Sequence, residues 1–303
     1  MTKFIKEQIL IPAWNITKDD FKIKRFYMFP WLLSIIFLTV LLVYQSIYTY
    51  VELFWKKDEA LVVILWFFQN DYILEILITT TIFLISYIIL TPIFEWWLIK
   101  YIHLKNCNKE ISSSEAFWQW IYKFLPVFEY NNIFSEFKIM SILNWFLFTI
   151  RFLWIEYIIN IVYVFLVILL VWIIINILFS YSKYIIVIEN KKVFEAIWIS
   201  SKITILNIKT TTKLYFLMFF LNLRVLFNFI IFLFFPIIIV IAIWLITTKI
   251  FLVVAITILS TLFIIFILAL WYLTSVLEVF KTSIWYYSYI EWKKKLEDME
   301  EKK

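Results

Sequence analysis

The chain has 303 residues, of which 64% are hydrophobic and only 17% are charged, and its formal net charge is +6. A soluble globular domain is nearer half apolar and a quarter charged, so this composition excludes an ordinary soluble fold and predicts an all-α polytopic membrane protein. The single Cys107 excludes an internal disulfide framework, and the single His103 argues against a histidine-ligated metal site. We therefore expect no bound metal and no cofactor.

Long apolar stretches predict six membrane-spanning helices and three regions. The spans are expected at about 29–51, 77–99, 139–155, 159–181, 214–235 and 250–275. The apolar block 139–182 is divided because one helix of that length would be about twice as long as the bilayer core is thick. The first half of this block is short, and a re-entrant segment is the alternative there. The regions are an amphipathic N-terminal segment 1–28, a membrane domain 29–280 and a charged tail 281–303.

Positive charge is distributed unevenly along the chain. The segments 1–28, 100–138, 183–213 and 281–303 hold 6, 5, 6 and 6 of the 28 Lys and Arg residues. Six spans with both termini in the cytoplasm would place all four segments on the cytoplasmic side, as the positive-inside rule requires. This predicts a multi-pass protein of the cell (inner or plasma) membrane, surrounded by the lipid bilayer, with anionic lipid head groups near the lysines. The same topology accounts for the net charge, so no nucleic-acid partner is expected, and the sequence names no protein partner.

One predicted cytoplasmic connection contains Glu115 and Ala116. A capping box from Ser112 to Glu115 predicts that a helix begins there, and Pro126 is expected to end or bend that helix. An interfacial amphipathic helix is the simplest interpretation of this segment.

The second connection contains the charged, amphipathic stretch Val193–Lys202, which lies between two long apolar blocks. Helical spacing brings Phe194, Trp198 and Ile205 onto one face. A helix lying on the surface is therefore expected here as well.

Glycine is absent and tryptophan occurs 16 times. About 7% glycine is usual, and membrane helices contain more glycine than soluble ones. Trp172 and Trp244 lie inside long apolar runs, where tryptophan is less usual than at the interfaces. One hypothesis is that many of these positions are glycine in the organism, because some bacterial lineages read UGA as glycine. The alternative is a natural tryptophan-rich protein, and the codons distinguish the two.

The sequence contains no HExxH motif, no Ser-His-Asp set and no glycine-rich phosphate loop, which predicts a protein that is not an enzyme and has no catalytic residues. The candidate intramembrane polar site is centred on Arg224, because a charge at the bilayer centre costs about 2.5–3.5 kcal/mol on insertion scales and usually faces a bundle interior or wet cavity. Asn228 shares its helical face, and Ser260 and Thr261 are expected at similar depth. Such a site would accept an anion, a carboxylate solute or a lipid phosphate. The structural alternative is that Arg224 hydrogen-bonds to neighbouring amides and hydroxyls.

The residues from Tyr184 to Ser200 follow the pattern Y-x-x-V-x-E, five further residues, and then E-A-I-x-x-S. This pattern resembles a segment of uncharacterised polytopic bacterial membrane proteins, which are similar to the membrane domain attached to some glycerophosphodiester phosphodiesterases. On this match Glu195, Ala196 and Ser200 are motif positions. The resemblance implies an integral membrane domain. It does not imply phosphodiesterase activity, because the soluble barrel of those enzymes is absent.

Two functions follow as expectations. The first is a non-enzymatic structural, regulatory or lipid-environment protein of the membrane. The alternative is a small-solute or lipid transporter or permease component with a site near Arg224. Glu115-Ala116 and Glu195-Ala196 each follow a predicted span pair, which would fit the parallel repeats of some transporters.

Overall fold

The structure is a computed structural model that describes residues 3–24, 27–28, 62, 73–109, 124–134, 146, 149, 158–224, 227 and 249–301. Within these residues no strand occurs, which confirms the predicted all-α class for this part of the chain. The elements are the π-helix η1 (Ile5–Leu10), α1 (Ile11–Asp19), α4 (Ile73–Asn106), α6 (Leu125–Ile133), α8 (Ile158–Leu178), α9 (Ser182–Glu189), α10 (Val193–Leu206) and α12 (Lys249–Glu300). A further helical stretch, residues 208–224, follows α10 after one turn residue.

Three helical stretches are long and apolar enough to cross a membrane. They are Leu77–Asn106, Ile159–Glu189 and Ile264–Met299. They overlap the second, fourth and sixth predicted spans. The first and third predicted spans, 29–51 and 139–155, lie outside the described residues apart from 146 and 149, and the fifth is described only as far as Arg224 and at 227.

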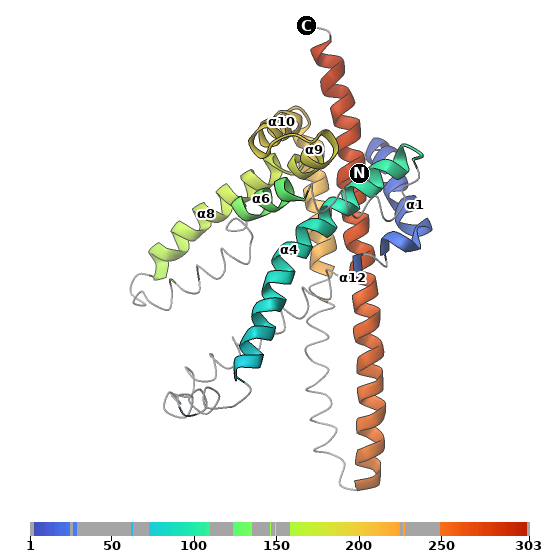
Figure 1. The fold of residues 1–303 in the computed structure, drawn as a ribbon. Helices are drawn as coiled ribbons and strands as arrows, with labels where there is room; N and C mark the ends of the chain where they lie inside the picture. The colour runs from blue at the N-terminus through green and yellow to red at the C-terminus, as the bar shows by residue number, and fades with distance from the viewer. Residues whose placement is uncertain are drawn as a thin grey trace.

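The lower parts of α4, α8 and α12 expose most of their apolar side chains. We call residues 74–90, 159–174 and 254–273 the apolar legs. Ile82 and Val167, for example, are exposed by 59% and 60%. In Figure 1 the legs of α4 and α12 run downward from the head, whereas the leg of α8 runs obliquely to the lower left. Water would solvate such a surface poorly, whereas the hydrocarbon core of a bilayer suits it, since each helix satisfies its own backbone hydrogen bonds.

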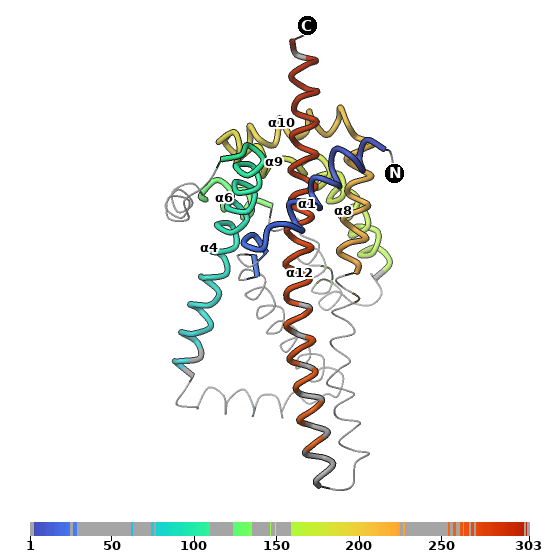
Figure 2. The backbone as a smooth tube through the Cα atoms, turned by 90° about the vertical axis from the view of Figure 1, so that its right-hand side faces the viewer, coloured from blue at the N-terminus to red at the C-terminus, as the bar shows by residue number. Residues whose placement is uncertain are grey.

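The upper parts of the helices pack together into a helical head. We define the head as η1, α1, residues 92–106 of α4, α6, α9, α10 and residues 274–300 of α12. Its main core joins side chains from α4, α9, α10 and α12, among them Trp96, Ile102, Tyr184, Ala196 and Tyr286. In Figure 2, α12 runs through the head and continues below it as a leg. One continuous helix therefore couples the packed region to the apolar region.

The N-terminal helices pack against α12 and the start of residues 208–224. Ile5, Ile9 and Ala13 recur at intervals of four residues, and they are buried against Leu214 and Ile284. This spacing places the three side chains on one helical face. The N-terminal segment thus covers the side of α12 within the head.

Two asparagines supply the left-handed backbone positions found among the described residues. Asn108 has φ 53° and Asn190 has φ 55°. Asparagine tolerates this region better than other non-glycine residues, and Asn190 ends α9 in the usual left-handed cap conformation. Since no described tryptophan has a positive φ, the backbone conformation requires glycine at none of these tryptophan positions.

The apolar face predicted for the segment after Val193 is the outer face of α10. Phe194, Trp198 and Ile205 are exposed, whereas Ala196 and Ile203 are fully buried. Trp198 is therefore not part of the core, and the side of α10 that packs is the one with small and branched side chains.

Pro126 lies at the beginning of a helix. It lies in the first turn of α6, which begins at Leu125. Proline is favourable there because the first N–H groups of a helix have no intrahelical partner. The predicted helix start at Ser112 lies outside the described residues.

Candidate functional site

Ser200 joins α10 to the end of α8. Its hydroxyl donates to the carbonyl of Leu178 at 2.8 Å and accepts the backbone N–H of Tyr181 at 3.1 Å. Thr204, one turn later, donates to the same carbonyl at 3.2 Å. A helix leaves its last four carbonyls without intrahelical partners, and these two hydroxyls satisfy one of them inside the head.

Of the other motif positions, one lies on the buried face of α10 and one on its exposed face. Ala196 is fully buried in the main core, where a larger side chain would not fit. Glu195 is exposed and forms an ion pair with Lys191 at 2.5 Å. Glu115 and Ala116 lie outside the described residues. Ser200 thus builds the joint between α8 and α10, Ala196 packs in the main core, and their assignment to a functional motif stays a prediction.

A buried hydroxyl network joins this joint to α12. The Tyr181 hydroxyl lies 2.9 Å from the hydroxyl of Ser288 and 3.1 Å from that of Thr211. The Tyr184 hydroxyl donates to the carbonyl of Thr282 at 3.2 Å. Buried polar groups are costly unless they are hydrogen-bonded, so these contacts specify how α9 and residues 208–224 lie against α12.

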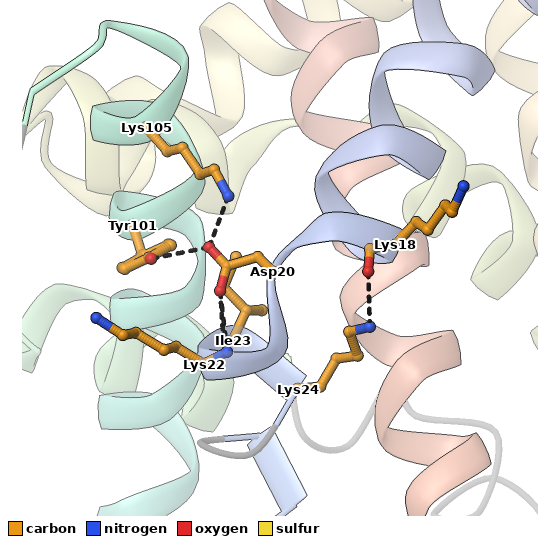
Figure 3. A network of polar contacts seen from close by, with 7 residues as sticks. All are labelled: Lys18, Asp20, Lys22, Ile23, Lys24, Tyr101 and Lys105. Carbon is orange, nitrogen blue, oxygen red and sulfur yellow. Dashed lines mark hydrogen bonds and ion pairs between the residues drawn. The ribbon is translucent and has the colours of Figure 1, made fainter.

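Asp20 joins the N-terminal segment to α4 (Figure 3). One of its oxygens accepts from Lys105 at 2.7 Å and from Tyr101 at 2.9 Å, and the other accepts from the backbone N–H of Lys22 at 2.9 Å. Burial alone would raise the pKa of Asp20, but the hydrogen bonds from Lys105, Tyr101 and the backbone of Ile23 outweigh it and hold the pKa below its ordinary value. The carboxylate is thus stabilised in its charged form.

A third polar cluster is centred on the carboxylate of Glu95. The ammonium of Lys183 lies 2.7 Å from the carboxylate of Glu95, and the Asn131 amide donates to the same oxygen at 3.0 Å. The three residues come from α9, α4 and α6, which are far apart in sequence. Lys183 also lies over the Tyr130 ring, with its nitrogen 5.9 Å from the ring centroid.

A small open pocket of about 130 Å³ lies beside this ion pair. It is formed by α6, the end of α8 and the start of α9, and its lining includes Tyr130, Asn131, Phe134, Asn176, Phe179 and Lys183. Burial raises the pKa of Tyr130 well above its ordinary value, so its hydroxyl stays protonated and donates, at 3.4 Å, to the carbonyl of Phe179. The pocket therefore combines one cation, two amides and three aromatic rings beside a carboxylate.

The predicted site at Arg224 is described only in part. Arg224 is exposed at the end of the described helix 208–224. The Thr261 hydroxyl donates to the carbonyl of Thr257 in its own helix at 2.8 Å. Asn228 and the side chain of Ser260 lie outside the described residues. The grouping of these four residues stays a prediction.

The part of the chain that the structure describes holds no group of three or more His, Cys, Asp and Glu side chains arranged to bind a metal ion. The single histidine and the single cysteine lie near the end of α4. His103 Nδ1 lies 3.1 Å from the Tyr286 hydroxyl, and Cys107 is exposed.

Sequence reasoning missed the pocket because its residues come from three separate segments. The available signal was electrostatic: Glu95 is an acidic residue near the inner end of one predicted span, and Lys183 is the first charged residue after another. The two residues pair because the fold brings α4 and α9 together, which the sequence does not show. No family of known proteins, no curated protein and no solved structure matches this chain.

Proposed function

We propose that the chain is a non-enzymatic, multi-pass protein of the cell membrane that holds a helical head against the cytoplasmic surface and organises the lipids beneath it. The observation that carries this proposal is that α4, α8 and α12 each continue from the packed head into an apolar leg whose side chains are mostly exposed. A bilayer would surround such legs, and the lysine-bearing head would lie at its surface, as at the cytoplasmic face of membrane proteins.

The full proposal has six spans with both termini in the cytoplasm. Three helices are long and apolar enough to serve as spans. The stretches 29–51, 139–155 and 214–235 are proposed as the remaining three because of their length and apolarity and because this arrangement gathers the lysine-rich segments on one side. The head would then lie among anionic lipid head groups, which the lysines attract.

The resemblance of Tyr184–Ser200 to membrane domains found beside phosphodiesterases is part of the same proposal. Its support is that the two small motif positions, Ala196 and Ser200, are buried, and that Ser200 bonds to the end of α8. The transport alternative would have its site near Arg224, which is exposed at the end of the described helix 208–224.

The single cysteine makes the topology directly testable. Cys107 is exposed in the turn after α4, on the proposed cytoplasmic side. In intact cells a membrane-impermeant maleimide should leave Cys107 unlabelled, and labelling should appear once the membrane is permeabilised. In a Cys107→Ser background, Glu75→Cys at the other end of α4 should be labelled in intact cells. Labelling of Cys107 before permeabilisation would overturn the proposed orientation.

A further inference from the structure

The N-terminal region has two faces where it meets the rest of the head. We call residues 14–24 the boundary segment. Its Phe21 is exposed by 62% and its Trp14 by 53%, whereas Ile23 and the adjoining Ala13 are fully buried. One face therefore packs in the head, and the other presents two aromatic rings to the surroundings.

Contacts with α12 place the boundary segment at the upper end of that helix's uncharged part. The Ser275 hydroxyl donates to the carbonyl of Lys24 at 2.8 Å, and the rings of Trp14 and Phe280 meet edge to face with their centroids 5.7 Å apart. No charged residue occurs in α12 from 250 to 277. This stretch is about 40 Å long, enough to cross a hydrocarbon core of about 30 Å, so its upper end would lie among the head groups.

Contacts with α4 give the same height. Asp20 accepts hydrogen bonds from Tyr101 and Lys105 (Figure 3). The uncharged part of α4 extends from residue 76 to 94, and Tyr101 lies about 10 Å beyond its end along the helix. Two separate legs thus place the boundary segment just above the region that suits hydrocarbon.

Exposed lysines accompany the aromatic rings. Lys18 and Lys22 are both exposed, and Figure 3 shows their side chains extending to opposite sides of the segment. One acidic residue, Asp19, is exposed between them. Lysine side chains can lie along an apolar surface while their ammonium groups reach lipid phosphates, and aromatic rings are enriched at the same depth. This combination fits the head-group layer of a bilayer better than it fits water.

We propose that the boundary segment inserts Trp14 and Phe21 into the head-group layer of an anionic bilayer, with Lys18 and Lys22 at lipid phosphates. This inference rests on the proposed function, because it requires that the legs lie in a bilayer. It adds to that function the surface of the head that touches lipid. Since hydrogen bonds tie the same segment to α4 and α12, insertion fixes the height of the head above the membrane.

The other end of the N-terminal helices supplies a matched control. Phe4 is exposed by 42%, and its ring lies 5.5 Å from that of Trp292. Trp292 lies about 18 Å beyond Phe280 along α12. Lys3 and Lys6 are exposed beside it. Phe4 thus has similar neighbours in sequence but should lie in water, above the head groups.

Fluorescence quenching of the full chain in lipid nanodiscs tests the proposal. In a Cys107→Ser background, an NBD fluorophore is attached to Phe21→Cys or, as the control, to Phe4→Cys, in nanodiscs of phosphatidylcholine and phosphatidylglycerol. Lipids with a nitroxide near the head group should quench the label at position 21 at least about twofold more strongly than the label at position 4. Aqueous iodide should show the reverse order. Trp14→Cys is a second labelling position, which keeps the test decisive if labelling at position 21 disturbs the fold.

The lysines are tested by removing the anionic lipid. Lipid quenching at position 21 should be weaker in nanodiscs of phosphatidylcholine alone, because the lysines then lose their attraction to net negative charge. Lys18→Gln and Lys22→Gln together should abolish this dependence on phosphatidylglycerol. Lys3→Gln and Lys6→Gln together should retain it. Equal effects of the two double variants would overturn the assignment of Lys18 and Lys22.

The two proposals fail differently. If alkaline carbonate releases the wild-type chain from membranes, the proposed integral membrane function fails. If the chain stays in the membrane but iodide quenches positions 21 and 4 equally, only the contact of the boundary segment with lipid fails. Protection from iodide without quenching by lipid would mean that protein, such as a second copy of the chain, covers the rings, and it would also overturn this contact.

Discussion

Hydroxyl groups behave differently in the legs and in the head. In the legs, Thr81 and Thr261 donate to the carbonyls of Leu77 and Thr257 four residues earlier, each at 2.8 Å. In the head, the Ser275 hydroxyl donates at 2.8 Å to the carbonyl of Lys24, about 250 residues away in sequence. A threonine that satisfies its hydroxyl within its own helix can face lipid in any orientation, whereas a hydrogen bond between distant segments fixes which helix lies against which.

This difference indicates which part of the protein contributes most to the stability of the fold. The head contains buried apolar side chains and hydrogen bonds between distant segments. Truncating a side chain there leaves a cavity or removes a hydrogen-bond partner, and both lower the free energy of unfolding. The legs present their side chains outward, where lipid replaces any atom that is removed. Substitutions in the head should therefore affect unfolding far more than matched substitutions in the legs.

Truncating a buried apolar side chain in the head should cause the largest loss of unfolding free energy. Ile102→Ala should destabilise the protein by about 2–5 kcal/mol, because Ile102 is fully buried in the main core and the change leaves a cavity. Ile82→Ala, in the exposed leg of the same helix, is the matched control and should change the unfolding free energy by less than about 0.5 kcal/mol. Chemical unfolding in micelles, followed by tryptophan fluorescence, measures both. Equal losses would mean that the legs pack as tightly as the head.

The next effect concerns the joint between α8 and α10. Ser200→Ala should cost about 1–3 kcal/mol, because it leaves the Tyr181 N–H without its buried acceptor and removes a donor to Leu178. The neighbouring Ser201 is a close control, since its hydroxyl donates to Ile197 in its own helix at 2.9 Å. Ser201→Ala should be nearly neutral in the same unfolding measurement. A similar loss for both serines would contradict the role assigned to the joint.

Asp20 should make the head sensitive to acid. Because the folded state lowers the pKa of Asp20 below its ordinary value of 3.8, the stability it contributes is fully present above that value and is lost as the pH falls through the folded-state pKa. At neutral pH, Asp20→Asn should cost about 1–2 kcal/mol through weaker hydrogen bonds to Lys105 and Tyr101. Unfolding curves between pH 2 and 7 should show the wild-type advantage shrinking below about pH 4. Glu7→Gln breaks only an exposed pair with Lys3, so its curve should parallel the wild type.

The smallest expected change in stability comes from replacing Trp172 or Trp271 by phenylalanine. The indole N–H of Trp172 is buried without a hydrogen-bond partner, whereas that of Trp271 donates to the carbonyl of Met28 at 2.6 Å. Trp172→Phe should be neutral or stabilising by up to about 1 kcal/mol, and Trp271→Phe should be destabilising by a similar amount. Thermal unfolding of the two variants compares them directly. A loss on Trp172→Phe as large as that on Trp271→Phe would weaken the hypothesis that Trp172 replaces a glycine.

Apolar runs were enough to predict the helical class and the approximate positions of three of the helices. A stretch such as 159–181 has to satisfy its backbone inside a bilayer, and only a helix does so within a single segment. Local reasoning did not locate the start of α6 at Leu125, because proline is tolerated in the first turn of a helix as readily as it ends one, and sequence alone does not say which. It also did not identify the packed face of α10, where the small residues Ala196 and Ser200 are buried.

The sequence by itself determined the helical class and the stretches long and apolar enough to cross a membrane, because composition and the length of apolar runs depend on neighbouring residues alone. Only the tertiary structure decided which charges and hydroxyls meet. Asn131 and Lys183 lie 36 and 88 residues from Glu95, whose carboxylate they share, and Tyr181 reaches Ser288 across 107 residues. Such contacts depend on how α4, α6, α9 and α12 are placed, and no periodicity within one helix encodes that placement.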